Sequence, residues 1–257
     1  MRSFQLLNIL FTIITILVNG AASALPLNGQ TTGEISNSFP IYFVPAGYVF
    51  AIWGLIYLAL LAFTIYQALP SQRDNSTLQR ISPFYWLASI ANCVWLFLWH
   101  FERFPLTIVA MGFLLVSLII IFLILQMTAG LGKVFRLLVN LPFSIYLGWV
   151  SVATIANASQ LLYFLEWDAW GISGEVWAFI MLLVATLLGL LMLWLYRNAP
   201  FSLVLVWAFV GIARAQSNSI LVSYAALTLA ALLLIATIVI PLIQYRQRRA
   251  ALRTPAI

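Results

Sequence analysis

Eight long apolar runs, separated by short polar breaks, limit what this chain can fold into. The runs cover about residues 4–24, 46–69, 83–101, 105–128, 137–163, 176–196, 201–216 and 220–244. A helix needs about 20 apolar residues to cross a bilayer, and lipid offers a bare backbone no hydrogen-bonding partner. We therefore predict an all-α fold, a polytopic transmembrane helical bundle of about eight spans. Four prolines lie near the expected helix starts, where a missing N–H group costs nothing: Pro83, Pro105, Pro142 and Pro200.

The scarcity of charge excludes a water-soluble fold. Only 7% of the residues are charged, against about 25% in a typical soluble domain, so most of the surface must face the lipid bilayer. The net charge of +6 lies at the ends of the apolar runs and indicates topology, so no nucleic-acid partner is expected. With one cysteine, one histidine and six acidic residues, neither an internal disulfide nor a multi-ligand metal site is expected.

The distribution of basic residues predicts the orientation. If the N-terminus is cytoplasmic, ten of the 12 Lys and Arg residues fall on the inner side, and only Arg103 and Arg214 fall outside. Five of the six acidic residues also fall outside: Glu34, Glu102, Glu166, Asp168 and Glu175. Because this bias follows the positive-inside rule, we predict a multi-pass protein of the plasma or inner membrane with both termini in the cytoplasm.

The first apolar run allows two interpretations. A basic start, an apolar stretch and the small-residue end GAASALP are typical of a signal peptide, and cleavage near Ala24 would leave seven helices. The alternative is an uncleaved first span. Cleavage would place the mature N-terminus outside. We favour the uncleaved span.

A short sequence occurs twice. NLPFSIYLGW (140–149) returns as NAPFSLVLVW (198–207), and both copies enter their span from the predicted cytoplasmic side. The repeat indicates either an internal duplication, of the parallel kind found in transporters, or simply a shared way of starting a helix. Both interpretations stay open at this point.

Three of the predicted spans carry aromatic rings beside small residues on one helix face. Residues three, four and seven apart share a face. The span at 46–69 gathers Phe50, Trp53, Gly54 and Tyr57; the span at 83–101 gathers Ala88, Asn92, Trp95 and Trp99; the span at 137–163 gathers Tyr146, Trp149, Ala153, Ala156 and Asn157. Such faces suit a planar, mostly apolar ligand. Plain packing of the bundle explains them equally well.

The same three stretches resemble a known family. FVPAGYVFAIWGLIY (43–57), ANCVWLFLW (91–99) and YLGWVSVATIAN (146–157) are similar to segments of the tryptophan-rich sensory proteins, the TspO/MBR family that includes the translocator protein. The resemblance covers about residues 1–163. It implies a five-helix membrane core over 1–163. The apolar runs that follow predict three additional transmembrane helices at 164–245, without a counterpart in the five-helix members, and a basic cytoplasmic tail at 246–257.

Members of this family bind porphyrins, haem-like tetrapyrroles and sterols between these helices. The resemblance therefore implies a pocket between the spans at 46–69, 83–101 and 137–163 for a porphyrin or haem-like ligand, with no required cofactor, and it allows for a homodimer. Together with the aromatic faces it gives this set of candidate ligand-binding residues: Trp53, Tyr57, Asn92, Trp95, Trp99, Tyr146, Trp149, Ala153 and Asn157. His100 could serve as an axial haem ligand, but an interfacial histidine is the favoured interpretation. Arg214 could pair with a ligand carboxylate, although snorkelling toward the headgroups is favoured.

The function predicted from the sequence is that of a membrane binding protein. The middles of the spans contain no Asp, Glu, Lys, Arg or His, which argues against a proton relay and against an enzyme with buried acid–base chemistry. We expect a sensor, carrier or regulator for a planar hydrophobic ligand such as a tetrapyrrole, with no catalytic residues. The alternative is a facilitative transporter of a small apolar or amphipathic substrate.

Overall fold

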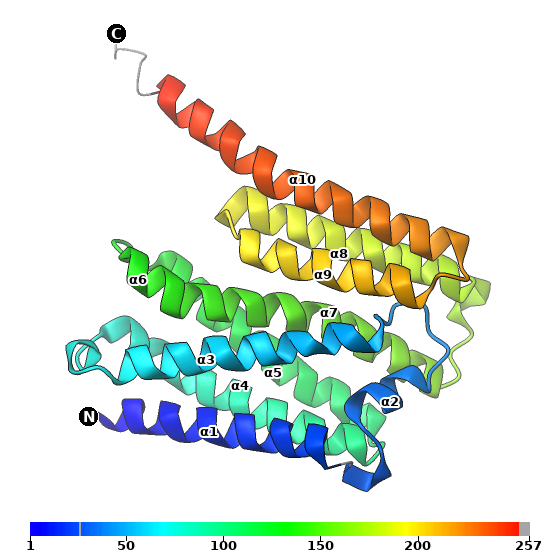
Figure 1. The fold of residues 1–257 in the computed structure, drawn as a ribbon, viewed down its shortest axis with the longest axis horizontal. Helices are drawn as coiled ribbons and strands as arrows, with labels where there is room; N and C mark the ends of the chain where they lie inside the picture. The colour runs from blue at the N-terminus through cyan, green and yellow to red at the C-terminus, as the bar shows by residue number, and fades with distance from the viewer. Residues whose placement is uncertain (26, 252–257) are drawn as a thin grey trace.

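The computed structural model describes residues 1–25 and 27–251, and over these residues it contains helices and no strand (Figure 1). Seven helices are long and apolar enough to cross a membrane, and a shorter apolar helix at Ala199–Ala215 makes the eighth. These eight helices are α1 (Ser3–Ala24), α3 (Ile52–Ala68), α4 (Ser76–His100), α5 (Phe104–Met127), α7 (Leu141–Phe164), α8 (Gly174–Tyr196), α9 (Ala199–Ala215) and α10 (Ile220–Ala251). The predicted polytopic bundle of eight spans is confirmed.

Two helices begin earlier than the prolines predict. Pro83 lies inside α4, because the side chain of Asn75 accepts hydrogen bonds from the first free N–H groups and starts the helix there. Pro142 lies inside a continuous helical stretch, Lys133–Phe164, made of α6 (Lys133–Phe135), a π-helical segment η4 (Arg136–Asn140) and α7. The π-helical hydrogen bonds carry the helix past the proline. Pro105 and Pro200 do lie in the first turns of α5 and α9.

The helices form two groups that meet along one seam (Figure 1). α1, α3, α4, α5 and α7 pack together, while α8, α9 and α10 pack on one another beside them. α9 lies against α7 at the seam, where a Cβ atom added to Gly148 would be 3.1 Å from the carbonyl oxygen of Phe201. A glycine at this position therefore lets the two backbones come close.

The two copies of the repeat meet at the start of this seam. The side-chain amide of Asn198 in the second copy donates to the hydroxyl of Ser144 in the first (3.1 Å). Asn198 also caps α9 by accepting from the N–H of Phe201, whereas the corresponding Asn140 lies in the π-helical segment and its Oδ1 has no partner. A shared way of starting a helix therefore describes the second copy only.

The first helix turns polar side chains into the bundle. Its buried residues include Gln5, Asn8, Thr12, Thr15 and Asn19, which follow one another at spacings of three and four. All but Thr15 hydrogen-bond to α3 or α4; the Thr12 hydroxyl, for example, lies 2.7 Å from that of Thr64 and 2.6 Å from that of Tyr85. α1 is thus an integral part of the bundle, with its polar face turned inward and its leucines and isoleucines turned outward.

The two ends of the bundle differ in charge. The start of α1 and the end of α10 lie at the same end (Figure 1), as do Arg73, Lys133, Arg136 and Arg197. Glu34, Glu102 and the loop after α7 lie at the other end. Of the predicted basic tail at 246–257, α10 includes the residues up to Ala251, while 252–257 and the side chains of Arg246, Arg248 and Arg249 lie outside the described residues.

Candidate functional site

A cleft of about 390 Å³ opens at the acidic end of the bundle. Its walls come from α1, α3 and α4, and the short helix α2 (Thr32–Asn37) with the turn before it closes part of the mouth. The lining residues used below are Asn19, Glu34, Phe50, Trp53, Tyr57 and Trp95. A volume of this size falls within the range of about 300–1,000 Å³ typical of small-molecule pockets.

Two aromatic side chains from α3 and one from α4 supply the flat apolar surface of the cleft. Trp53 stacks on Tyr57 with 5.6 Å between ring centroids and 17° between planes. Trp95 stacks on Trp99 with 5.2 Å and 21°. The sequence thus identified three residues of the cleft wall, Trp53, Tyr57 and Trp95, while Trp99 supports Trp95 from behind.

Asn157 holds Trp95 in place. Its Oδ1 accepts a hydrogen bond from the Trp95 indole Nε1 (3.1 Å), and its Nδ2 donates to the Thr107 hydroxyl on α5 (2.8 Å). Because the indole N–H already has a partner, Trp95 offers the cleft only its ring surface. Asn157 was predicted to bind ligand directly; the structure places it in the layer behind the cleft, where it fixes an aromatic ring.

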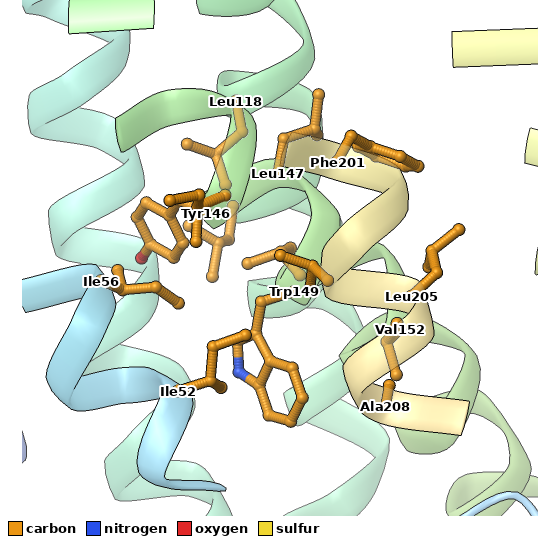
Figure 2. Close-up of a cluster of buried hydrophobic side chains, with 14 of the residues drawn as sticks. Ile52, Ile56, Leu118, Tyr146, Leu147, Trp149, Val152, Phe201, Leu205 and Ala208 are labelled. Atoms are coloured by element: carbon orange, nitrogen blue, oxygen red, sulfur yellow. The ribbon is translucent and has the colours of Figure 1, made fainter. Parts of the chain in front are cut away.

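The predicted residues of α7 also lie in this second layer, and none of them lines the cleft. Trp149 and Tyr146 are each 2% exposed and pack edge-on against Trp53, at centroid distances of 6.2 and 5.9 Å. Figure 2 shows both rings beside the isoleucines of α3, while neighbouring α7 side chains turn toward α9. Ala153 packs, half-buried, against the core.

Tyr146 and Trp149 keep polar atoms without partners. The Tyr146 hydroxyl, the Trp149 indole Nε1 and the Thr15 hydroxyl are buried and make no hydrogen bond. An unpartnered buried polar group is unfavourable. Thr15 lies one helical turn from Asn19, deeper in the bundle than the cleft.

The sequence analysis missed the polar part of the wall, which comes from α1 and α2. Asn19 donates from Nδ2 to the Oδ1 of the predicted residue Asn92 (2.7 Å), so Asn92 lies buried behind Asn19 and off the cleft wall. The regular spacing of Gln5, Asn8, Thr12, Thr15 and Asn19 was a signal for this face, since polar residues at such spacing share one side of a helix. For α2 the available signal was the Thr31–Glu34 spacing, which is typical of a capping box at a helix start.

Glu34 gives the cleft mouth a negative charge. Its carboxylate accepts hydrogen bonds from the backbone N–H (2.7 Å) and the hydroxyl (2.9 Å) of Thr31, which together cap α2. These bonds hold the pKa of the Glu34 carboxyl below its ordinary value. The carboxyl therefore stays ionised at neutral pH and disfavours a ligand carboxylate at this edge.

α9 positions the chain segment that leads into the cleft. The N–H of Ala46 donates to the carbonyl of Gly211 (3.0 Å), and the indole Nε1 of Trp207 donates to the carbonyl of Val49 (3.1 Å). The short helix η2 (Gly47–Ala51), which contributes Gly47 and Phe50 to the cleft wall, is thereby fastened to the second helix group. This gives the C-terminal helices a structural role at the site.

His100 does not present a free ring nitrogen. It is 1% exposed, with Nδ1 2.9 Å from the Leu96 carbonyl and Nε2 3.4 Å from the Thr32 hydroxyl. His100 ends α4, and α2 covers its ring through the Thr32 contact. That it is an interfacial histidine stays a prediction. Among residues 1–25 and 27–251, no group of three or more His, Cys, Asp or Glu side chains could hold a metal ion. Arg214, the other single candidate, is exposed.

Comparison with known proteins gives one match. A family model described as TSPO-like protein matches residues 5–239. The match runs from the first turn of α1 into α10 and crosses the domain boundary predicted at residue 163. No curated protein and no solved structure matches the chain.

Proposed function

Since the chain belongs to the TSPO-like family, we propose that this membrane protein binds a planar, mostly apolar molecule, such as a porphyrin, in the cleft under α2. It would act as a sensor, carrier or regulator of that ligand, without catalysis. The observation that carries the proposal is the pair of aromatic stacks, Trp53 on Tyr57 and Trp95 on Trp99, that two helices bring to one cleft.

The layer behind the cleft supports this proposal because it fixes the rings before any ligand arrives. Trp53 is braced by Trp149 and Tyr146, and Trp95 by Trp99 and a hydrogen bond from its indole to Asn157. Rings that are already ordered lose little conformational entropy on binding. A flat ligand gains stacking and apolar burial at low cost.

The polar mouth constrains the ligand further. With Glu34 ionised, an acidic substituent is repelled at the α2 edge, while hydroxyl or cationic groups are favoured. A porphyrin is therefore expected to bind more tightly as a neutral ester than as a dicarboxylate. We further propose that the basic end of the bundle faces the cytoplasm, which places the cleft mouth on the outer side of the plasma or inner membrane.

A titration of the purified protein with protoporphyrin IX and with its dimethyl ester tests the proposal, with tryptophan quenching and the porphyrin absorbance band as readouts. Both ligands should saturate, the ester with higher affinity. Trp95→Ala and Trp53→Ala should each weaken binding by about tenfold, because stacking on one aromatic ring is worth about 1–3 kcal/mol. Trp149→Ala should weaken it by a few fold through loss of support to Trp53.

Trp194→Ala is the matched control, because Trp194 is 53% exposed on α8, away from the cleft. Each variant must remain monodisperse before its affinity is compared. Absence of saturable binding by either porphyrin, or equal weakening in the control, would refute the proposal.

A facilitative transporter is the second candidate. The buried and unpartnered hydroxyls of Thr15 and Tyr146 favour it, because they provide polar partners deeper than the cleft. It predicts counterflow of the bound ligand across proteoliposomes, whereas a binder shows occupancy without flux. Thr15→Val should then slow flux more than it weakens binding.

A further inference from the structure

A second cleft, of about 380 Å³, lies at the basic end of the bundle. It is formed where the end of α5, the start of α7 and the turn between α8 and α9 come together. We call it the basic cleft. Its polar lining includes Arg136, Asn140, Ser144, Arg197 and Asn198. It shares no residue with the aromatic cleft described above.

The two arginines of the basic cleft carry unpaired charge. In the part of the chain that the structure describes, the one ion pair joins Arg2 to Asp74, so neither Arg136 nor Arg197 has a carboxylate partner there. Five of the six acidic residues lie at the opposite end. A guanidinium presents several N–H donors in a plane and binds phosphate well.

The local backbone fixes the position of Arg197. Arg197 ends α8 in the left-handed conformation, with φ 53°, and its N–H donates to the Leu193 carbonyl. Its side-chain Nε donates to Gln244 on α10, which leaves both terminal NH₂ groups of the guanidinium for another partner. The hydrogen bond from Asn198 to Ser144 holds the adjoining turn against α7.

Asn140 provides a further, independent observation. Its Oδ1 is buried and has no hydrogen-bond partner, and the residue is one of those that line the basic cleft. An acceptor in this position suits a ligand that carries a hydroxyl donor next to its anionic group.

The surroundings of the basic cleft indicate a lipid. Met127, Leu137 and Leu195 adjoin cleft residues along the chain and are 79%, 59% and 61% exposed. In a membrane protein such side chains face acyl chains. Basic pockets between transmembrane helices near the membrane surface are suited to anionic headgroups.

We propose that the basic cleft binds the phosphate of an anionic phospholipid whose headgroup carries hydroxyls, such as phosphatidylglycerol. Arg136 and Arg197 contact the phosphate, and Asn140 accepts a hydrogen bond from the headgroup hydroxyl. The lipid then bridges the start of α7 and the α8–α9 turn, where the two copies of the repeat meet.

Native mass spectrometry of the full chain, delipidated and then given lipid, tests this proposal. Phosphatidylglycerol should be retained about tenfold better than phosphatidylcholine, and Arg136→Gln and Arg197→Gln should each lower its affinity by about tenfold. Lys133→Gln and Arg73→Gln remove the same charge from the same end but outside the cleft, so they should change affinity by less than about twofold. Equal losses in cleft variants and controls, or equal retention of both lipids, would overturn the proposal.

Two additions make the result decisive. Asn140→Asp keeps both arginines but adds a negative charge, and it should also weaken phosphatidylglycerol binding by about tenfold; this variant decides the matter if an arginine variant does not fold. Glycerol 1-phosphate is the water-soluble probe. If it binds as tightly as the lipid and is equally sensitive to the arginine substitutions, the basic cleft is a phosphate site, but its ligand is a soluble phosphate and the lipid assignment is overturned. If neither probe responds to any cleft substitution, the site does not exist.

Discussion

Gly211 offers a sharp test of how α9 positions the aromatic cleft. A Cβ atom at this position would overlap Val49 Cγ2 and would lie 3.1 Å from Pro45 Cβ and 3.3 Å from Val49 Cβ. Both Cβ atoms are attached directly to the backbone, so side-chain rotation alone cannot relieve these contacts. Gly211→Ala should therefore push the 45–49 segment, and with it η2, away from α9.

The expected magnitude follows from two opposing effects. Alanine is favoured over glycine inside a helix by about 1 kcal/mol, while overpacking a close contact costs about 1–3 kcal/mol. The net result for Gly211→Ala is a loss of up to about 2 kcal/mol in the free energy of unfolding. The shift of η2 should also weaken porphyrin binding by a few fold, because Gly47 and Phe50 belong to the cleft wall.

Gly112→Ala in α5 is the matched control, since an added Cβ atom there meets nothing within 4 Å. It should gain about 1 kcal/mol from helix propensity alone and leave porphyrin affinity unchanged. Denaturant titration in mild detergent measures both unfolding free energies, and the porphyrin titration measures affinity. If Gly211→Ala is as stable as Gly112→Ala and binds porphyrin normally, the close approach of α9 does not constrain the cleft.

Three further substitutions test the polar contacts. Thr12→Val should lower the free energy of unfolding by about 1–2 kcal/mol, since hydrogen bonds inside membrane bundles are worth about 0.6 kcal/mol on average and up to about 1.7; an unchanged denaturation midpoint would contradict this. Thr31→Ala keeps the backbone N–H donor but removes the hydroxyl donor, so it should raise the pKa of Glu34 part of the way toward its ordinary value in a carboxyl ¹³C NMR titration; an unmoved midpoint would show that the hydroxyl does not contribute. Because that pKa is depressed in the folded protein, the cap stabilises α2 above the ordinary carboxyl pKa and is lost as the pH falls through the depressed value. Asn157→Leu should shift the ¹⁵N resonance of the Trp95 indole and weaken porphyrin binding by a few fold; a resonance that stays in place would mean that the hydrogen bond is absent in solution.

The number of spans could be predicted because it depends on a property that each segment carries alone. Apolar length forces a helix in lipid, and all eight runs are helices in the structure. The starts were less predictable. Pro83 marks a helix start only where no residue before it caps the helix. Here Asn75 caps α4 upstream of Pro83, so the helix begins earlier.

The candidate site could be predicted only in part, for a related reason. Helical spacing shows which residues share a face, and it correctly grouped Trp53 with Tyr57 and Trp95 with Trp99. Helical spacing does not show which residues line the cleft and which lie in the layer behind its wall. Trp149 and Asn157 were therefore predicted to contact the ligand, whereas the structure shows that they contact Trp53 and Trp95, the rings that line the cleft. That distinction depends on contacts between helices far apart in sequence.

The polar face of α1 has a consequence for how the protein is made. Gln5, Asn8 and Asn19 find their partners on α3 and α4, at positions such as Gln67, Ser82 and Asn92, which leave the ribosome after α1 has already met the membrane. We expect the insertion machinery to keep this segment out of bulk lipid until those later residues arrive. Truncated nascent chains that stop before Asn92 should then crosslink to the translocon through α1, and longer ones should be released.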